Sequence, residues 1–189
     1  PRTALDKCKN IDFLKQTGVY FLFGTDNSDN PVVYIGQAGI RKNGKGLLLR
    51  IQEPHNSIDY WTEAIMFTTT NNSFGPTEIS YLENRFCNMA IEAGRYSVKN
   101  GNDPNPGNIT EETESELEEF IDYAKIVMGA LGHKVFEPLA PIADPADNEP
   151  NLYLEYSKAK ATGKRTSDGF VVFKGSVINP SLAKSCPER

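Results

Sequence analysis

Two short apolar segments near the N-terminus constrain the fold of this chain more than any other feature. Residues 18–24 read GVYFLFG and residues 32–36 read VVYIG, with the sequence TDNSDNP between them. Aromatic and β-branched residues favour strands, whereas Asn, Asp and Pro favour turns. The two segments therefore predict neighbouring strands of a β-hairpin.

Later segments predict two helices and a third strand. Residues 45–53, KGLLLRIQE, place three apolar side chains on one face of a short helix, and residues 60–70, YWTEAIMFTTT, are typical of a strand. A further helix is expected over residues 78–93, with Thr77 as its N-cap and Gly94 at its end. This order of elements indicates a small α/β unit with too few strands for a doubly wound sheet.

The clearest helical pattern in the chain follows Thr110, which stands where an N-cap is expected. Its glutamate-rich first turns suit the positive end of the helix dipole, and we interpret this acidic run as a solvated face. Gly132 is the expected C-cap. The apolar face comprises Leu117, Phe120, Ile121, Ala124, Val127, Met128 and Leu131.

The chain is predicted to contain two domains joined by a linker. Residues 1–139 form the first domain, and residues 140–151, rich in Pro, Ala and acidic residues, form the linker. Residues 152–189 are expected to form a small strand-rich domain. Its strands are expected at LYLEY and at DGFVVFKGS, separated by the polar, basic stretch SKAKATGKRTS.

The net charge of −5 hides an uneven distribution of charge along the sequence. Residues 103–150 carry a balance of −10, whereas residues 1–60 carry +2 and residues 151–189 carry +4. Because phosphate contacts depend on local patches, the overall acidity does not exclude nucleic acid as a ligand.

The three cysteines, Cys8, Cys87 and Cys186, are far apart and have no metal-binding spacing. This pattern argues against a disulfide framework or a zinc site and indicates a reducing, cytoplasmic location. No apolar run approaches the length of a bilayer span, so no membrane partner is expected.

The tripeptides GVY at residues 18–20 and YIG at residues 34–36 resemble the two tripeptides that name the GIY-YIG nuclease family. The resemblance covers about residues 18–102, because an arginine on the next helix and a glutamate on the helix after the third strand follow in the family's order. It implies an α+β fold with a small three-stranded antiparallel sheet flanked by helices. It also implies a metal-dependent endonuclease that hydrolyses phosphodiester bonds of DNA.

By this resemblance, Tyr20 and Tyr34 are paired tyrosines, one near the attacking water and one near the phosphate. Arg50 would brace two phosphate oxygens through its planar guanidinium group. Glu83 would hold Mg²⁺ or Mn²⁺, since one carboxylate and several waters are a normal site for Mg²⁺. A tyrosine is a poor base at neutral pH unless a cation lowers its pKa, and Arg50 and the metal are the candidates for that effect.

Three of these assignments have alternatives in the sequence. The family's late asparagine is expected at Asn100 or at Asn102. Arg41 competes with Arg50, because the gap between the second tyrosine and Arg50 is longer than in compact family members. His55 is either a base or phosphate donor at the site, or an ordinary surface residue.

The tract after the second strand is expected to form one wall of the site. Gly36 would leave room for an approaching phosphate, and the basic residues of the tract suit nucleic acid. The alternative is a solvated loop. The expected substrate-binding residues are Gly36, Gln37, Arg41, Lys42, Lys45 and Asn102.

Two other functions are weighed against the nuclease. One is a catalytically weak or inactive nucleic-acid-binding module of a larger DNA-processing system with partner subunits. The other is a protein-interaction module whose acidic helix mimics or repels nucleic acid. The tail, residues 168–176, resembles part of a small domain of unknown function that follows such nucleases. Its charge suits either an auxiliary DNA contact or a structural pair of strands.

Overall fold

The computed structural model divides the chain into two compact units, Pro1–Pro138 and Leu139–Arg189, which are described separately. The described residues are 1–39, 46–53, 61–101, 104–139, 150–166 and 169–177.

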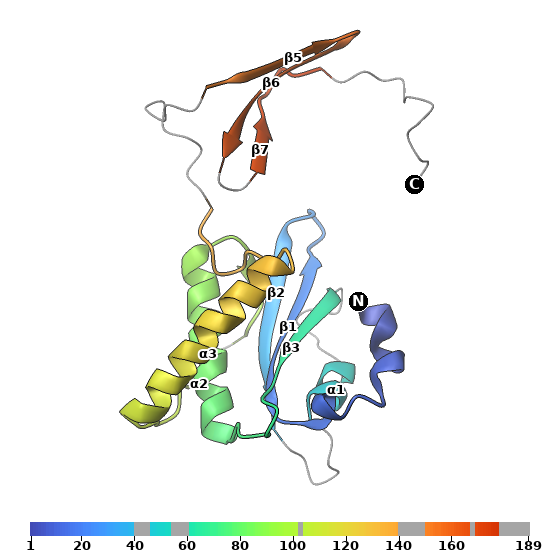
Figure 1. The fold of residues 1–189 in the computed structure, drawn as a ribbon. Helices are drawn as coiled ribbons and strands as arrows, with labels where there is room; N and C mark the ends of the chain where they lie inside the picture. The colour runs from blue at the N-terminus through green and yellow to red at the C-terminus, as the bar shows by residue number, and fades with distance from the viewer. Residues whose placement is uncertain (40–45, 54–60, 102–103, 140–149, 167–168, 178–189) are drawn as a thin grey trace. The chain divides into compact units, whose positions relative to one another are not determined.

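The first unit is built on a four-stranded sheet in the order β3-β1-β2-β4. Figure 1 labels β1, β2 and β3 of this sheet. β1 (Gly18–Thr25) pairs antiparallel with both β2 (Pro31–Ala38) and β3 (Trp61–Phe67). The predicted hairpin and third strand are therefore confirmed. The expectation of a purely antiparallel, three-stranded sheet was wrong, because β4 (Ser97–Val98) adds a short parallel pairing to β2. Two residues are too few to give a sequence signal for a strand.

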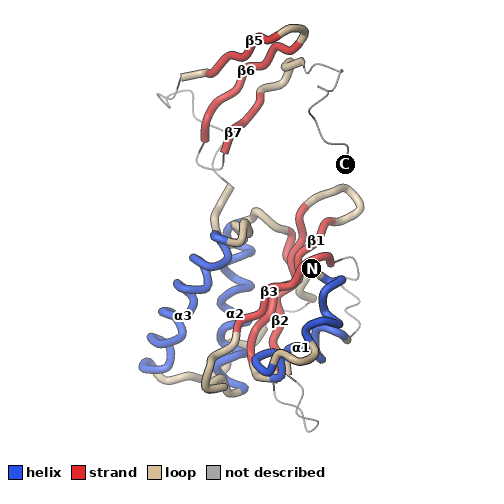
Figure 2. Tube along the Cα trace, turned by 45° about the vertical axis from the view of Figure 1, so that its right-hand side comes forward, coloured by secondary structure: helices blue, strands red, loops and turns tan. Residues whose placement is uncertain are grey.

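Helices cover both faces of this sheet, as Figures 1 and 2 show. α2 (Pro76–Ala93) and α3 (Glu111–Ala130) lie on one face. α1 (Leu47–Gln52) lies on the other, together with two 3₁₀ segments, η1 (Arg2–Cys8) and η2 (Asp12–Lys15).

The structure confirms the predicted C-terminal end of α2 but not its predicted N-cap. The N-cap is Gly75 rather than Thr77, because Pro76 occupies the first turn, where its missing N–H costs nothing. Gly94 ends the helix as predicted: it is left-handed, with φ 63°, and its N–H donates to the carbonyl of Ala90.

Strand alternation sends successive side chains of β1 into two different cores. Phe21 and Phe23 pack with α2 and α3, whereas Tyr20 and Leu22 pack on the side of α1. The same alternation in β2 places Tyr34 on the α1 side with Tyr20. Alternation, together with the register that pairs Tyr20 with Gly36, thus brings both tyrosines to one face.

The long acidic helix has a narrower buried stripe than its apolar sequence predicted. Thr110 caps α3 as expected, accepting a hydrogen bond from the N–H of Thr113 at 3.2 Å. Val127 and Leu131 are 44% and 58% exposed, contrary to expectation, because they lie outside the stripe that faces the rest of the unit. The buried residues of α3 are Leu117, Ile121, Ala124 and Met128.

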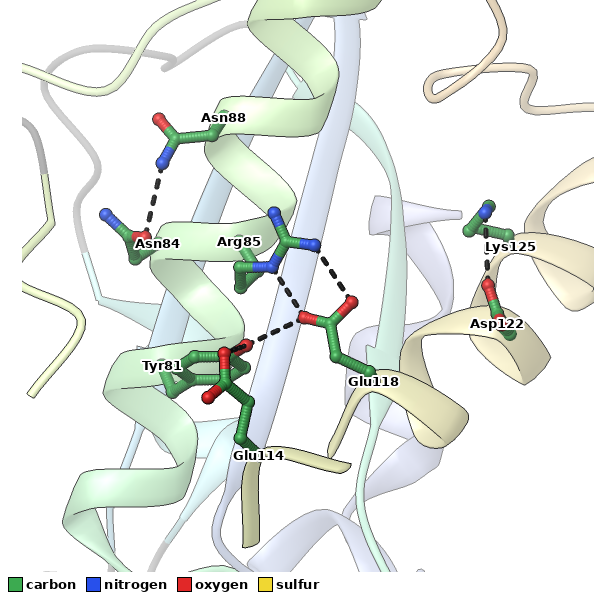
Figure 3. A network of polar contacts seen from close by, with 8 residues as sticks. All are labelled: Tyr81, Asn84, Arg85, Asn88, Glu114, Glu118, Asp122 and Lys125. Atoms are coloured by element: carbon green, nitrogen blue, oxygen red, sulfur yellow. Dashed lines mark hydrogen bonds and ion pairs between the residues drawn. The ribbon is translucent and has the colours of Figure 1, made fainter. Parts of the chain in front are cut away.

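A cluster of hydrogen-bonded polar side chains connects α3 to α2 (Figure 3). Arg85 donates two hydrogen bonds to Glu118, at 2.6 and 2.8 Å, and the hydroxyl of Tyr81 donates to the same carboxylate at 2.8 Å. Tyr81 also lies 3.1 Å from Glu114. The guanidinium of Arg85 is the main cause that lowers the pKa of Glu118 from its ordinary value of 4.5.

This lowered pKa predicts a pH-dependent contribution to stability. Ionised Glu118 stabilises the fold above pH 4.5, and the contribution is lost as the pH falls through the lower folded-state value. Glu118→Gln should therefore reduce the free energy of unfolding by about 1 kcal/mol at neutral pH, because the pair is partly exposed. Urea unfolding at a series of pH values measures this.

Glu116→Gln, on the exposed face of the same helix, is the matched control and should have little effect. The difference between wild type and Glu118→Gln should shrink as the pH is lowered below 4.5. A constant difference across that range would contradict the assignment.

The second unit contains a three-stranded antiparallel sheet in the order β5-β6-β7. Its strands are β5 (Leu152–Tyr156), β6 (Ala159–Thr166) and β7 (Gly169–Val172). The basic stretch that was expected to separate two strands is itself the central strand β6. Its lysines and small residues carry little strand propensity, so pairing on both sides must stabilise it. No described helix of the chain is long and apolar enough to cross a membrane.

Candidate active site

The register of the hairpin explains the glycine of the YIG tripeptide. Gly36 lies directly opposite Tyr20 in the β1–β2 pairing. A Cβ atom at position 36 would overlap the ring and hydroxyl of Tyr20. Gly36 therefore makes room for a tyrosine ring, which differs from the expectation that it leaves room for a phosphate.

We expect Gly36→Ala to lower the free energy of unfolding by about 1–3 kcal/mol, the usual cost of overpacking a core. Tyr20 is fully buried and cannot move aside freely. Gly39→Ala is the matched control, since a Cβ there would meet only Ile79 Cδ1 at 3.9 Å. Equal stability of the two variants in urea unfolding would contradict this account of Gly36.

The two tyrosines of the motif are neighbours in different environments. Their ring centroids are 6.2 Å apart and the ring planes are tilted by 32°. Tyr20 is fully buried, whereas Tyr34 is half-buried and reaches solvent. Burial, followed by the proximity of Tyr34, raises the pKa of Tyr20 well above its usual value of 10.0, although the charge of Arg50 opposes this shift. Tyr20 is therefore protonated at neutral pH.

Arg50 reaches the tyrosines from α1. Three apolar residues of this helix, Leu47, Leu48 and Ile51, are buried and fix the helix against the sheet. Arg50 Nη1 donates to Glu53 Oε2 at 2.8 Å, a partner that the sequence analysis did not identify. Burial alone would lower the pKa of Arg50, but Glu53 and both tyrosines raise it overall, so the guanidinium is charged.

Glu83 approaches the same place from α2. Its carboxylate Oε2 accepts a hydrogen bond of 2.7 Å from Gln37 Nε2, and Gln37 also contacts Ser80 Oγ at 3.2 Å. Burial raises the pKa of Glu83, while Gln37 and Arg50 oppose that shift. Gln37 was expected to bind substrate, but in the structure its amide orients the glutamate. Ser80 was missed, although it lies one helical turn before Glu83.

Arg50 and Glu83 come from opposite faces of the sheet and meet around the edge of β2. Among the residues that the structure describes, β4 pairs with Val32 and Val33, and no further strand pairs with the later part of β2 on that side. The charges of Arg50 and Glu83 shift the pKa of Tyr20, and the charge of Arg50 shifts the pKa of Glu83. Such influence requires proximity. The structure therefore brings Tyr20, Tyr34, Arg50 and Glu83 together.

Asn100 has a structural position beside this group. Its Nδ2 donates to the carbonyl of Ile35 at 2.6 Å, and its Oδ1 accepts from the N–H of Ile35 at 3.1 Å. The side chain thus continues the edge pairing where β4 stops and fixes the backbone between Tyr34 and Gly36. Asn100 is a positioning residue here, because both its polar groups are used by the backbone.

Several residues named from the sequence lie outside the described part of the chain. These are Arg41, Lys42, Lys45, His55 and Asn102.

The carboxylate of Glu83 is suited to hold one divalent cation with water as the other ligands. Gln37 Nε2 donates to Oε2, and the backbone of Gln37 also interacts with this carboxylate. The described residues do not contain a group of three or more His, Cys, Asp or Glu side chains that could hold a metal. A single carboxylate with several waters fits the coordination habits of Mg²⁺ better than those of zinc.

Comparison of the chain with protein-family models, with curated proteins and with solved structures finds no match. The candidate active site is therefore defined by its residues and their geometry.

Proposed function

We propose that the first unit is a GIY-YIG-type endonuclease that hydrolyses phosphodiester bonds of DNA with Mg²⁺ or Mn²⁺. The observation that carries the proposal is that Tyr20, Tyr34, Arg50 and Glu83 lie within electrostatic reach of one another beside the edge of β2. These four residues come from two strands and two helices. Hydroxyls or ion pairs that only stabilised the fold would have no need to gather at one place. Their types match the needs of phosphodiester hydrolysis.

In this reaction, the oxygen of a water molecule attacks phosphorus, and the bond from phosphorus to the leaving ester oxygen breaks. Negative charge grows on the phosphoryl oxygens during the attack. Arg50 is proposed to donate two N–H groups to these oxygens, and its half-buried position strengthens that interaction. Glu53 holds the guanidinium in place before substrate arrives.

The tyrosines are proposed to have different roles. Tyr20 stays protonated, so its hydroxyl can donate a hydrogen bond to a neighbouring oxygen but does not act as a base. Tyr34 is the tyrosine that solvent reaches, and we place it next to the attacking water. This assignment places Tyr34, of the expected pair, near the attacking water.

Glu83 is proposed as the metal ligand, with Gln37 holding the carboxylate in position. A bound divalent cation would supply charge stabilisation and a lowered pKa of coordinated water. The hydrogen bond from Gln37 keeps the carboxylate oriented and opposes the rise in pKa caused by burial.

The second candidate function is a catalytically weak nucleic-acid-binding module of a larger DNA-processing system. One observation favours it: burial keeps Tyr20 protonated, which removes one of the two tyrosines as a base. In that case the chain would bind DNA without cleaving it.

A panel of DNA substrates separates the two candidates. Supercoiled, linear, single-stranded and branched DNA are incubated with the protein in Mg²⁺ or Mn²⁺, and in EDTA with later addition of metal. The nuclease predicts cleavage that EDTA stops and metal restores. Binding of DNA without cleavage of any form in either metal would support the binding module instead.

A further inference from the structure

The sheet of the second unit has two faces of different chemistry. Strand pairing sets the side chains of Tyr153, Thr162 and Phe173 in one row on one face, with Glu155 and Lys160 in the next row. The opposite face carries Leu152, Leu154, Tyr156, Phe170 and Val172, all of them exposed. We call the first face, which carries Glu155 and Lys160, the polar face, and it contains a depression.

A depression of about 310 Å³ lies on this polar face. Its floor is the backbone and side chains of β5 and β6, and its wall is the turn after β7. The side chains and turn residues used in the argument are Tyr153, Glu155, Lys160, Thr162, Lys174 and Ser176.

Hydrogen bonds fix the wall of the depression to the sheet. The N–H of Phe173 donates to the carbonyl of Thr162 at 2.8 Å, and Lys160 and Val177 exchange two backbone hydrogen bonds of 2.7 and 2.9 Å. Between them, Ser176 Oγ donates to the carbonyl of Phe173 at 2.8 Å. Gly175, with φ 97°, permits the tight turn. The wall is thus held in place before any ligand binds.

The described residues of this unit carry an excess of basic side chains, which favours an anionic ligand. Five of the six charged side chains in residues 150–166 and 169–177 are basic, and Glu155 is the one acid. Glu155 pairs with Lys160 at 2.6 Å, but both side chains are about 70% exposed, so the pair is weak. A phosphate group can compete for this lysine. The basic residues are Lys158, Lys160, Lys164, Arg165 and Lys174.

Tyr153 gives the depression a second kind of contact. Its side chain is 77% exposed on a strand of a sheet, where the ring offers a face for stacking. Unpaired bases stack on such rings, whereas the bases of a duplex are already stacked on each other. A ring beside two ammonium groups therefore suits a nucleotide of a single strand better than a duplex or an acidic protein surface.

We propose that this depression binds a nucleotide unit of single-stranded nucleic acid, with the base stacked on Tyr153 and the phosphate held by Lys160 and Lys174. Binding here does not depend on the nuclease activity. Only the further statement, that the bound strand is the substrate of the first unit, rests on the proposed function. Since the two units are one chain, binding at the second raises the effective concentration of the strand for the first.

The test measures binding by the full chain in EDTA, so that cleavage cannot interfere. The probe is a fluorescein-labelled oligothymidylate of about 12 nucleotides, within the usual site size of small binding domains. Fluorescence anisotropy is recorded at several salt concentrations. Tyr153→Ala should weaken binding about tenfold, because stacking of one base contributes roughly 1–3 kcal/mol.

Charge variants test the phosphate contact. Lys174→Ala should weaken binding and reduce the slope of log affinity against log salt by about 0.7, the value for one lost phosphate contact on a single strand. Glu155→Gln should tighten binding, since it removes the negative charge beside the phosphate. Tyr123→Ala and Lys125→Ala on α3 are matched controls with exposed side chains of the same types, and they should leave binding unchanged.

Equal affinity of wild type, Tyr153→Ala and Lys174→Ala would overturn the proposal, as would tighter binding of a duplex of equal length. Self-association in sedimentation that Tyr153→Ala abolishes, without any binding of the probe, would also overturn it and assign the face to a second copy. Failure of the nuclease proposal has a different signature: the probe binds in EDTA as predicted, but no DNA is cleaved when metal is added.

Discussion

Replacing Glu83 by glutamine should lower the rate of metal-dependent DNA cleavage by roughly 10³-fold or more, because the change removes the charge that holds the cation. Glutamine has nearly the same shape, and its carbonyl oxygen can still accept the hydrogen bond that Gln37 donates to Glu83. The fold should therefore persist. Single-turnover cleavage of a plasmid, together with thermal unfolding, measures both effects.

Two other glutamates on α2 serve as controls for this prediction. Glu92→Gln, exposed near the end of the helix, and Glu78→Gln, in its first turn, should keep wild-type rates. A Glu83→Gln variant that cleaves within a few-fold of wild type would remove Glu83 from the site. Loss of activity in Glu78→Gln instead would assign the metal ligand to Glu78, five residues closer to the start of α2.

Replacing Arg50 by alanine should lower the cleavage rate by about 10²–10³-fold, the usual cost of removing one donor that stabilises transition-state charge. The loss should appear in kcat more than in KM, because the interaction strengthens as charge develops on the phosphoryl oxygens. Arg50→Lys should recover only part of the rate, since an ammonium group cannot brace two oxygens in one plane.

Arg95→Ala is the matched control for Arg50. Arg95 donates to the carbonyls of Glu137 and Pro138, so it already serves the fold elsewhere in the unit. Its loss should change stability rather than the rate per folded molecule. If Arg50→Ala kept full activity while remaining folded, we would assign the phosphate contact to Arg41, the competing arginine in the sequence.

The fold was predictable where a local pattern repeats over several residues. The aromatic segments of β1 and β2, and the capped periodic sequence of α3, show such patterns, and the structure confirms them. β4 and β6 were not predictable in this way. β4 has only two residues, and β6 is polar and basic, so only pairing with neighbouring strands makes them strands.

Residue types and order predicted which residues meet at the candidate site, but not what each contacts. The resemblance to the GIY-YIG family implied the group around Tyr20 and Glu83, and the structure places its members within electrostatic reach of one another. The contacts of Gly36, Gln37 and Asn100 depend on strand register and on the sheet edge, which involve residues far apart in the sequence. Gly36 makes room for the ring of Tyr20, Gln37 orients Glu83, and Asn100 fixes the backbone of Ile35.

The central claim is that Arg50 and Glu83 belong to one active site, and a double-mutant cycle on the cleavage rate tests it most directly. Residues that act as a unit show strongly non-additive losses. We predict that Arg50→Ala combined with Glu83→Gln cleaves DNA no more slowly than the worse of the two single variants. Losses that multiply in the double variant, with all proteins folded, would contradict a shared site.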